Sequence, residues 1–278
     1  MPNFDPTEYK LSSKSNWNVV APDYHHNWAN GCVGPFGSTA ELIRIAEIRP
    51  SDKVLDLACG TGAVSKHAAE ILGKEGYIFG VDFSRTALSI ARGFVSSKNA
   101  NFFEMDAENL GFQYRFDRVL CQYGIMFFPN VNKVLKTVKN MLKPEGKMVL
   151  AVHGNAEEVP YFSSIMKPIL RHMPDIRPEG APTVHRFGNP SDLARELRSA
   201  GFVDVVIKSF KFTYEPGTFA EYWNDYMHST ANSIRPKIES MGREIISSIR
   251  DDSERNVSPY IREGIVVFPW IVHILSAC

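Results

Sequence analysis

The sequence predicts an α/β fold with a doubly wound, mostly parallel, seven-stranded sheet. Between residues 53 and 152, short apolar runs alternate with amphipathic stretches of helical spacing. This alternation is typical of βαβ units, whose right-handed crossovers place helices on both faces of a sheet. The chain has 278 residues, 44% of them hydrophobic, and is long enough to bury a substantial core.

The first elements follow one another in a regular order. Residues 1–40 are polar, aromatic and rich in turn residues, and we expect them to form an N-terminal cap segment. A helix is expected from Ser38, because Leu42 and Ile45 lie at helical spacing and Pro50 stands beyond its end. Strands are then expected at 53–58, 77–82, 101–105, 116–121 and 147–152, with helices at 63–72, 84–97 and 131–142.

Beyond residue 152 the alternation becomes irregular. Helices are expected at 161–173 and 190–201, and a strand at 202–210. The predicted parts are a Rossmann-like core over 41–210 with an insertion at about 154–188, a helical substrate lid over 211–258, and a final core strand within 259–278.

Composition narrows the possible partners. The 31 Lys and Arg residues balance 31 Asp and Glu residues, which argues against a nucleic-acid partner. The first residues lack the pattern of a signal peptide, and no apolar run is long enough to predict a membrane span. The chain has four cysteines, which include Cys32, and their spacing is not that of a metal-binding motif. We therefore expect a reduced, cytoplasmic protein without a bound metal.

A glycine-containing turn follows the first predicted strand. Residues 54–57 form the strand, and Ala58-Cys59-Gly60-Thr61-Gly62 form the turn. Such a strand carries the chain to the carboxyl edge of the sheet, where ligands bind in open α/β folds. Glycine lets the backbone approach a ligand closely. The turn alone does not identify the ligand, because dinucleotide-binding enzymes also use glycine-rich first turns.

Acidic residues stand at the ends of three consecutive predicted strands. Asp82 ends the second strand, 26 positions after Asp56, where a carboxylate is placed to accept hydrogen bonds from ribose hydroxyls. Phe83 follows and is suited to stack on a purine. Asp106, followed by Ala107, ends the third strand and is suited to accept from an exocyclic amine. Each acid alone is equally suited to cap a helix, but the ordered set favours a nucleoside-containing cofactor.

These motifs resemble those of the class I S-adenosylmethionine (SAM)-dependent methyltransferases. The most similar branch is the small-molecule one typified by the ubiquinone and menaquinone C-methyltransferases, and the resemblance covers about residues 40–210. The matching segments are VLDLACGTG from residue 54, GVDFS from 80, MDAENLGF from 105, FDRVLCQYGIMFFPN from 116 and LKPEGKMVLAVHG from 142.

The resemblance implies a cofactor site. The turn would lie under the methionine part of SAM, Asp82 would hold the ribose, Phe83 would pack on the adenine, and Asp106 would meet the adenine amine. The family also folds its N-terminal segment over SAM and adds a final antiparallel strand to the sheet. The residues expected to bind SAM are Tyr24, Trp28, Asp56, Ala58, Cys59, Gly60, Thr61, Gly62, Asp82, Phe83, Ser84, Asp106, Ala107, Cys121 and Gln122.

Two features depart from the family pattern. Ala58 stands where glycine is common in the wider family, although the small-molecule branch accepts alanine there. The segment 211–258 is longer than a simple connection, so the resemblance does not transfer any particular substrate.

A histidine is the candidate catalytic residue. His153 ends the fifth predicted strand at the carboxyl edge, and an imidazole titrates near neutral pH, as a general base must. A hydrogen-bonded structural role is the alternative for each histidine. Aromatic residues around 17–28, 123–128 and 161–162 either enclose an apolar or cationic acceptor or simply pack in the core. Further candidate bases are His25, His26, His172 and His185.

The sequence therefore predicts a SAM-dependent methyltransferase with a small-molecule acceptor. An NAD-dependent oxidoreductase is the first alternative, but its G-x-G-x-x-G motif requires glycine where Ser65 stands. A catalytically silent SAM-binding regulatory protein is the second. A protein or nucleic-acid acceptor is the remaining alternative. By analogy with the family, amino-group methylation of bases or glutamine is disfavoured, because Cys121-Gln122-Tyr123-Gly124 rather than an N-P-P-Y motif follows the fourth strand. The methylated atom and the oligomeric state stay open.

Overall fold

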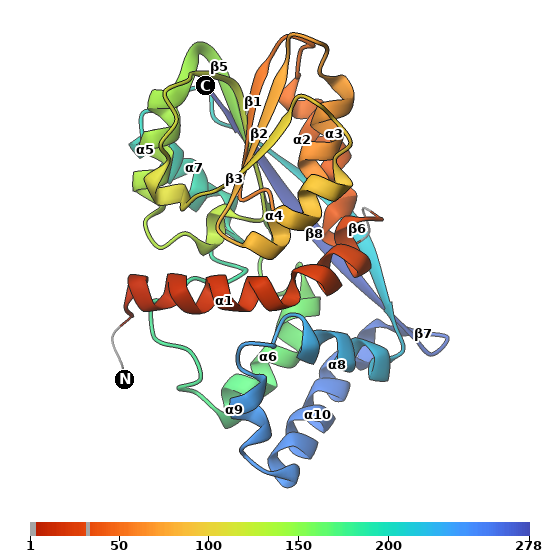
Figure 1. The fold of residues 1–278 in the computed structure, drawn as a ribbon. Coiled ribbons are helices and arrows are strands. Elements are labelled where there is room, and N and C mark those ends of the chain that lie inside the picture. Colours follow the sequence, from red (N-terminus) through yellow and green to blue (C-terminus); the bar gives the residue numbers. More distant parts are fainter. Residues whose placement is uncertain (1–3, 32–33) are drawn as a thin grey trace.

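The computed structural model describes residues 4–31 and 34–278, so Cys32 and the first three residues lie outside the described part. Within that part, the core is an eight-stranded sheet in the order β3-β2-β1-β4-β5-β8-β6, with the short β7 paired to β8 (Figure 1). The strands are β1 (Lys53–Leu57), β2 (Tyr77–Asp82), β3 (Ala100–Glu104), β4 (Phe116–Gln122), β5 (Leu142–His153), β6 (Val206–Gly217), β7 (Ile261–Arg262) and β8 (Ile265–Ala277). The predicted doubly wound α/β fold is confirmed.

The central strands are buried on both faces. Val54, Leu55 and Leu57 in β1 are fully buried, as expected for a parallel strand covered by helices on each side. Strands β1 to β5 are parallel, whereas β8 runs antiparallel to both β5 and β6. All carboxyl ends of the parallel strands therefore lie at one edge of the sheet.

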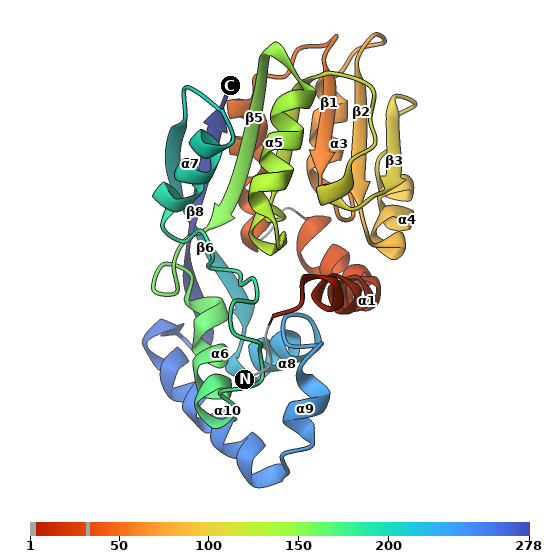
Figure 2. The ribbon, with the colours of Figure 1, turned by 90° about the vertical axis from the view of Figure 1, so that its left-hand side faces the viewer.

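Helices cover both faces of this sheet (Figure 2). On α5, Val134, Leu135 and Val138 are fully buried on one stripe, which attaches the helix to the core. The Ser84 hydroxyl accepts from the Ala87 N–H and caps α4, which ends earlier than predicted. The helices packed on the sheet are α2 (Thr39–Ala46), α3 (Ala63–Ile71), α4 (Arg85–Phe94), α5 (Val131–Met141) and α7 (Pro190–Ser199).

Two strands are longer than predicted. Leu142 already pairs with Phe116. Residues 143–146, which were expected to separate the helix at 131–142 from the strand at 147–152, therefore lie inside β5, at an irregularity in its pairing. The strand predicted at 202–210 is found at Val206–Gly217, because the inward alternation continues through Phe212 and Tyr214. Residues 211–217 are thus strand rather than part of a helical lid.

The β6–β8 pair extends beyond the rest of the sheet. Strand β5 pairs only with 272–277 of β8, whereas β6 follows β8 from Ser276 to Val266. The protruding end is surrounded by helices that lie below the carboxyl edge in Figure 1. These helices are α6 (Pro160–His172), α8 (Phe219–His228), α9 (Arg235–Glu239) and α10 (Arg243–Val257).

Helix α1 (Pro6–Tyr24) crosses the molecule between the sheet and these lower helices (Figures 1 and 2). Asp5 caps it by accepting a hydrogen bond of 2.7 Å from the Thr7 N–H. A π-helical turn, His25–Ala29, continues it. No helix in the described part of the chain has the length and apolar character needed to cross a membrane.

Candidate active site

The turn after β1 brings three left-handed residues to the carboxyl edge. Ala58, Gly60 and Gly62 have φ of 56°, 53° and 91°. A Cβ on Gly62 would lie 3.0 Å from the Val95 side chain, whereas one on Gly60 would meet no atom within 4 Å. Gly60 therefore faces open space, and Gly62 seats α3 against α4. Ala58 adopts this conformation at an energetic cost, since the left-handed region crowds a Cβ atom.

Two carboxylates lie beside this turn, Asp56 fully buried and Asp82 half-buried. Asp82 accepts from the Gly60 N–H at 2.9 Å and from the Ser84 N–H at 2.8 Å, and burial raises its pKa. Asp56 accepts from the Ser65 hydroxyl at 2.6 Å. Burial, with a smaller contribution from the negative charge of Asp82, raises the pKa of Asp56 to about 7. No described cationic side chain pairs with Asp56, so this corner favours a ligand that brings hydroxyls and positive charge.

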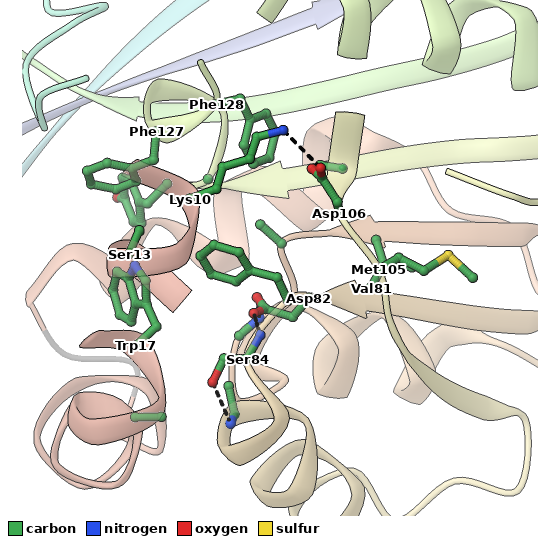
Figure 3. A pocket seen from close by; sticks show the side chains of 18 of the residues that line it. Lys10, Ser13, Trp17, Val81, Asp82, Ser84, Met105, Asp106, Phe127 and Phe128 are labelled. Carbon is green, nitrogen blue, oxygen red and sulfur yellow. Dashed lines mark hydrogen bonds and ion pairs between the residues drawn. The ribbon is translucent and has the colours of Figure 1, made fainter. Parts of the chain in front are cut away.

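These groups open into a cavity along the strand ends, which we call the edge cleft (Figure 3). The cleft is closed on one side by α1 and on the other by the strand ends. The sequence-predicted residues that line it are Tyr24, Ala58, Gly60, Thr61, Asp82, Phe83, Ser84, Asp106, Ala107 and Gln122. An adjoining recess also reaches Asp56 and Cys59.

Three predicted residues lie elsewhere. Gly62 and Cys121 are not among the described residues that line the cleft or the recess, and Cys121 is fully buried. Trp28 is also absent from both. Its indole N–H donates to the Tyr214 hydroxyl at 2.9 Å, and the side chain lines a second cavity.

Side chains on one face of α1 bind residues at the strand ends and hold the helix across them. The sequence analysis did not predict these contacts. Two lysine side chains reach the end of β3, and an asparagine side chain four residues further on reaches the residues after β2. The π-helical turn reaches the glycine turn after β1. The contacts join Lys10 to Asp106, Lys14 to Glu104, Asn18 to Ser84 and His25 to Thr61. The spacing was visible in the sequence, but the partners were not, because they lie on a different part of the chain.

Lys10 meets the carboxylate expected to bind an adenine amine (Figure 3). Its ammonium group lies 2.9 Å from Asp106 Oδ2 and 2.7 Å from Glu108 Oε2. Burial acts to raise the pKa of Asp106, but hydrogen bonds from Lys10 and the Glu108 N–H hold it below its usual value. An amine at Asp106 must therefore share this carboxylate with Lys10 or displace it.

The second cavity, which we call the lid cavity, lies between α1, the loop 173–188 and the segment 229–237. Its volume is about 500 Å³, a size suited to a small organic molecule. The side chains that line both cavities and so form a shared wall are Tyr9, Ser13, Trp17, Tyr24, Tyr123 and Phe127.

His153 stands at the inner end of the lid cavity. It is 5% exposed, and its ring stacks on Tyr123 with centroids 4.1 Å apart. Burial, with a smaller effect of His185, lowers the pKa of His153 well below its usual value. Tyr123 itself has a φ of 58°, and its hydroxyl donates to the Pro35 carbonyl. A strained backbone of this kind is common at functional sites.

The other candidate bases are not among the described residues that line either cavity; they are His25, His26, His172 and His185. His25 contacts Thr61 at 3.0 Å and stacks edge-on against Phe94. His172 lies near Asp252 on the surface of the lower helices. Among the described residues that line the lid cavity, His153 is the one histidine.

Comparisons of the sequence identify related proteins. A family model described as a methyltransferase domain matches residues 48–178. A ubiquinone/menaquinone biosynthesis C-methyltransferase from Wigglesworthia glossinidia brevipalpis is 32% identical over 152 residues, 53% of this chain and 56% of that protein. The chain therefore spans little more than half the length of this relative.

Two further relatives are matched over more of their length. A demethylmenaquinone methyltransferase from Bacillus cereus is 33% identical over 190 residues, 62% of this chain and 78% of that protein. An aklanonic acid methyltransferase from a Streptomyces species is 30% identical over 176 residues, 58% of this chain and 79% of that protein. These matches confirm the resemblance that the sequence motifs indicated.

Solved structures share the fold. A methyltransferase structure from Bacillus halodurans superposes with a TM-score of 0.59 at 21% identity, over 87% of this chain and 98% of that chain. A Haemonchus contortus phosphoethanolamine N-methyltransferase in complex with S-adenosyl-L-methionine gives a TM-score of 0.56 at 14% identity, over 95% of this chain and 56% of that chain. At these identities the similarity concerns the fold alone.

Proposed function

The chain belongs to the class I SAM-dependent methyltransferases, and we propose that it methylates a small molecule held in the lid cavity. The observation that carries this proposal is the shared wall of the two cavities, which includes Trp17, Tyr24 and Tyr123. An acceptor in the lid cavity and a cofactor in the edge cleft would meet at this wall. The relatives named for demethylmenaquinone and aklanonic acid support an acceptor of this size.

The residues of the edge cleft fit SAM. Asp82 would accept from the ribose hydroxyls, and the buried Asp56, which lacks a described cationic partner, would face the positively charged end of the cofactor. Gly60 leaves the space that a Cβ would fill. Tyr24 lines the cleft together with Asp82, and the charge of that carboxylate adds to burial in raising the pKa of the tyrosine.

Bound SAM supplies a methyl group on a positively charged sulfur. The work left to this chain is to hold the acceptor in line with that group, and correct positioning contributes about 7–11 kcal/mol in such reactions. The aromatic walls of the lid cavity exclude water and orient a planar acceptor. In this proposal the segments 1–40 and 218–258 act as cap and lid over the core at 41–217 and 259–278, with the insertion at 154–188 completing the enclosure.

Thermal melting with separate titrations of SAM, S-adenosylhomocysteine and NADH tests the cofactor site. A ligand at one hundred times its Kd stabilises the folded state by about 2.7 kcal/mol. We expect SAM and its product to raise the melting temperature, Asp82→Ala to abolish this effect, and Asp251→Ala, an exposed position on α10, to preserve it. A shift with NADH alone would instead support the oxidoreductase alternative.

Formation of S-adenosylhomocysteine then tests the acceptor class. Purified protein is incubated with SAM and with hydroxylated aromatic molecules, peptides or oligonucleotides in parallel. Turnover restricted to the small molecules supports the proposal. Turnover with peptides or oligonucleotides alone contradicts it, and SAM binding without turnover on any acceptor favours the silent regulatory alternative.

A further inference from the structure

The hydrogen bond between Trp270 and His153 fixes the state of the imidazole. Trp270, fully buried on β8, places its indole Nε1 3.2 Å from His153 Nδ1. An indole N–H donates and has no lone pair with which to accept. Nδ1 must therefore be the acceptor, and the hydrogen of the neutral ring must lie on Nε2.

The Nε2–H group of His153 points at the lid cavity. Within the described part of the chain this atom has no hydrogen-bond partner, and it is not among the polar atoms that are sealed from solvent. The ring lines the lid cavity, stacks on the Tyr123 ring and contacts the Phe162 ring at a tilted angle. A molecule in the cavity therefore meets a hydrogen-bond donor at this position.

The same contact prevents His153 from acting as a base. Its one lone pair already accepts from Trp270, and a proton added there would face the indole N–H. The titratable groups around the ring are Tyr123 and, across Phe162, His185. His185 Nδ1 donates to the Gly154 carbonyl at 2.8 Å, and this residue does not line the described cavity wall, so it does not supply the missing base.

We propose that His153 is a fixed hydrogen-bond donor to an acceptor that enters the lid cavity already ionised, as an aromatic carboxylate or enolate. This inference rests on the proposed methyltransferase function and names the acceptor class. In such an anion the negative charge is shared by two atoms, so one is free to attack while His153 binds the other. The attacking atom forms a bond to the methyl carbon and loses its negative charge. The methyl–sulfur bond breaks, its electron pair stays on sulfur as a neutral thioether, and no proton must be removed during transfer.

The charges of the lid cavity agree with an anionic acceptor. Of the charged residues in its described lining, Arg177 is half-buried, whereas Asp5, Glu8 and Lys237 are exposed. Arg177 forms no ion pair with a described residue. Arg177 lines this cavity together with Tyr9 of α1, and its charge opposes the rise that burial causes in the pKa of Tyr9. The partly desolvated charge in the cavity is thus positive.

Nitrogen-15 NMR of the protein bound to S-adenosylhomocysteine tests the imidazole state directly. We expect His153 to carry its proton on Nε2 at every pH from about 5.5 to 8.5, because protonation at Nδ1 is blocked. In Trp270→Phe the indole donor is absent, and we expect the neutral ring, which burial still keeps from protonation, to distribute its hydrogen between Nδ1 and Nε2. A hydrogen on Nδ1, or titration in the wild-type protein, overturns the proposal.

Binding of two matched probes tests the acceptor class. The probes are 2-hydroxy-1,4-naphthoquinone, which is an anion at neutral pH, and its neutral methyl ether, both with S-adenosylhomocysteine present. We expect the anion to bind about tenfold more tightly, the factor that a hydrogen bond to a charged group contributes. His153→Phe should reduce this preference to the part that the charge of Arg177 supplies, without weakening the ether. His153→Gln should retain the full preference, because its amide N–H takes the position of Nε2–H.

The outcomes separate this inference from the proposed function. Equal affinity for the two probes, an undiminished preference in His153→Phe, or binding of neither probe while S-adenosylhomocysteine still binds overturns the proposal. Loss of S-adenosylhomocysteine binding in the wild-type protein would instead contradict the methyltransferase site itself.

Discussion

The edge cleft and the lid cavity share a wall but differ in how they are built. The cleft places carboxylates and backbone N–H groups at the ends of neighbouring strands, and all its predicted members except Tyr24 fall within residues 56–122. The lid cavity is lined by aromatic rings and one imidazole from segments far apart in sequence. The cleft therefore offers a ligand several charged and backbone hydrogen-bonding groups, whereas the cavity offers an aromatic enclosure with few polar groups, His153 and Arg177 among them.

This difference predicts that damage to one region leaves the other intact. The cofactor should still bind when the aromatic support of the lid cavity is weakened. Likewise, changes to the carboxylates should spare the packing beneath the lid. The following experiments test this independence.

Removal of the indole at the base of the lid cavity should have the largest effect on stability. Trp270 is fully buried and contacts Trp28, His153 and Tyr161. We expect Trp270→Ala to lower the free energy of unfolding by about 3–5 kcal/mol, measured by denaturant titration, because it leaves a large cavity. Trp270→Phe is the milder control. Loss of S-adenosylhomocysteine binding in a folded Trp270→Phe protein would show that the two regions are coupled.

Neutralising Asp82 should have the next largest effect, on the cleft alone. The amide of Asp82→Asn loses the charge that would bind ribose hydroxyls, and it can no longer accept from both the Gly60 and Ser84 N–H groups. We expect about a hundredfold weaker S-adenosylhomocysteine binding by calorimetry, since hydrogen bonds to charged groups contribute about 1.5–3 kcal/mol each. An unchanged Kd would remove Asp82 from the cofactor site.

The pH dependence of cofactor binding should report on Asp56. Its pKa is about 7 in the folded protein against 3.8 in the reference state, so the unfolded chain binds fewer protons between these values. The contribution of this group to the free energy of unfolding therefore falls as pH rises from about 4 to about 7.

A positively charged ligand favours the ionised form of Asp56, so binding should release a proton. We expect the affinity for SAM, which carries a cationic sulfonium, to rise about eightfold from pH 6 to 7.5, as the ionised fraction of a group with a pKa of about 7 does. Asp56→Asn should lack this component. Asp82, whose pKa burial also raises, is present in both proteins, so the difference between them isolates Asp56. Parallel pH profiles would contradict this assignment.

A glycine at position 58 should have the smallest effect. Ala58 has a φ of 56°, and relief of this strain is partly offset by the greater entropy of an unfolded glycine. We expect Ala58→Gly to raise the free energy of unfolding by at most about 1 kcal/mol in thermal melts. Glu263→Gly, at a φ of 51° in an exposed turn outside both cavities, is the matched control. Destabilisation by Ala58→Gly alone would show that the alanine methyl contributes packing at the cleft.

The sequence predicted the core well because its signals are local. Strand β1, its turn and the acids after β2 and β3 each depend on a few consecutive residues and on the rule that parallel strands end at one edge. The extension of β6 was predictable in principle, since Phe210, Phe212 and Tyr214 continue its alternation. The positions of Trp28 and Cys121 outside the cleft were not predictable. Trp28 binds Tyr214 on a distant strand, and Cys121 is fully buried in the core.

The sequence by itself determined the order of the elements, the family and the polar edge of the sheet, because hydrophobic periodicity and short motifs carry that information along the chain. Only the tertiary structure decided that α1 closes the edge, that the β6–β8 pair carries a lid, and that an aromatic cavity adjoins the cleft. It also placed Trp270, 117 positions away, against His153 and so fixed the proton of that imidazole. These features depend on contacts between distant segments, which no local pattern specifies.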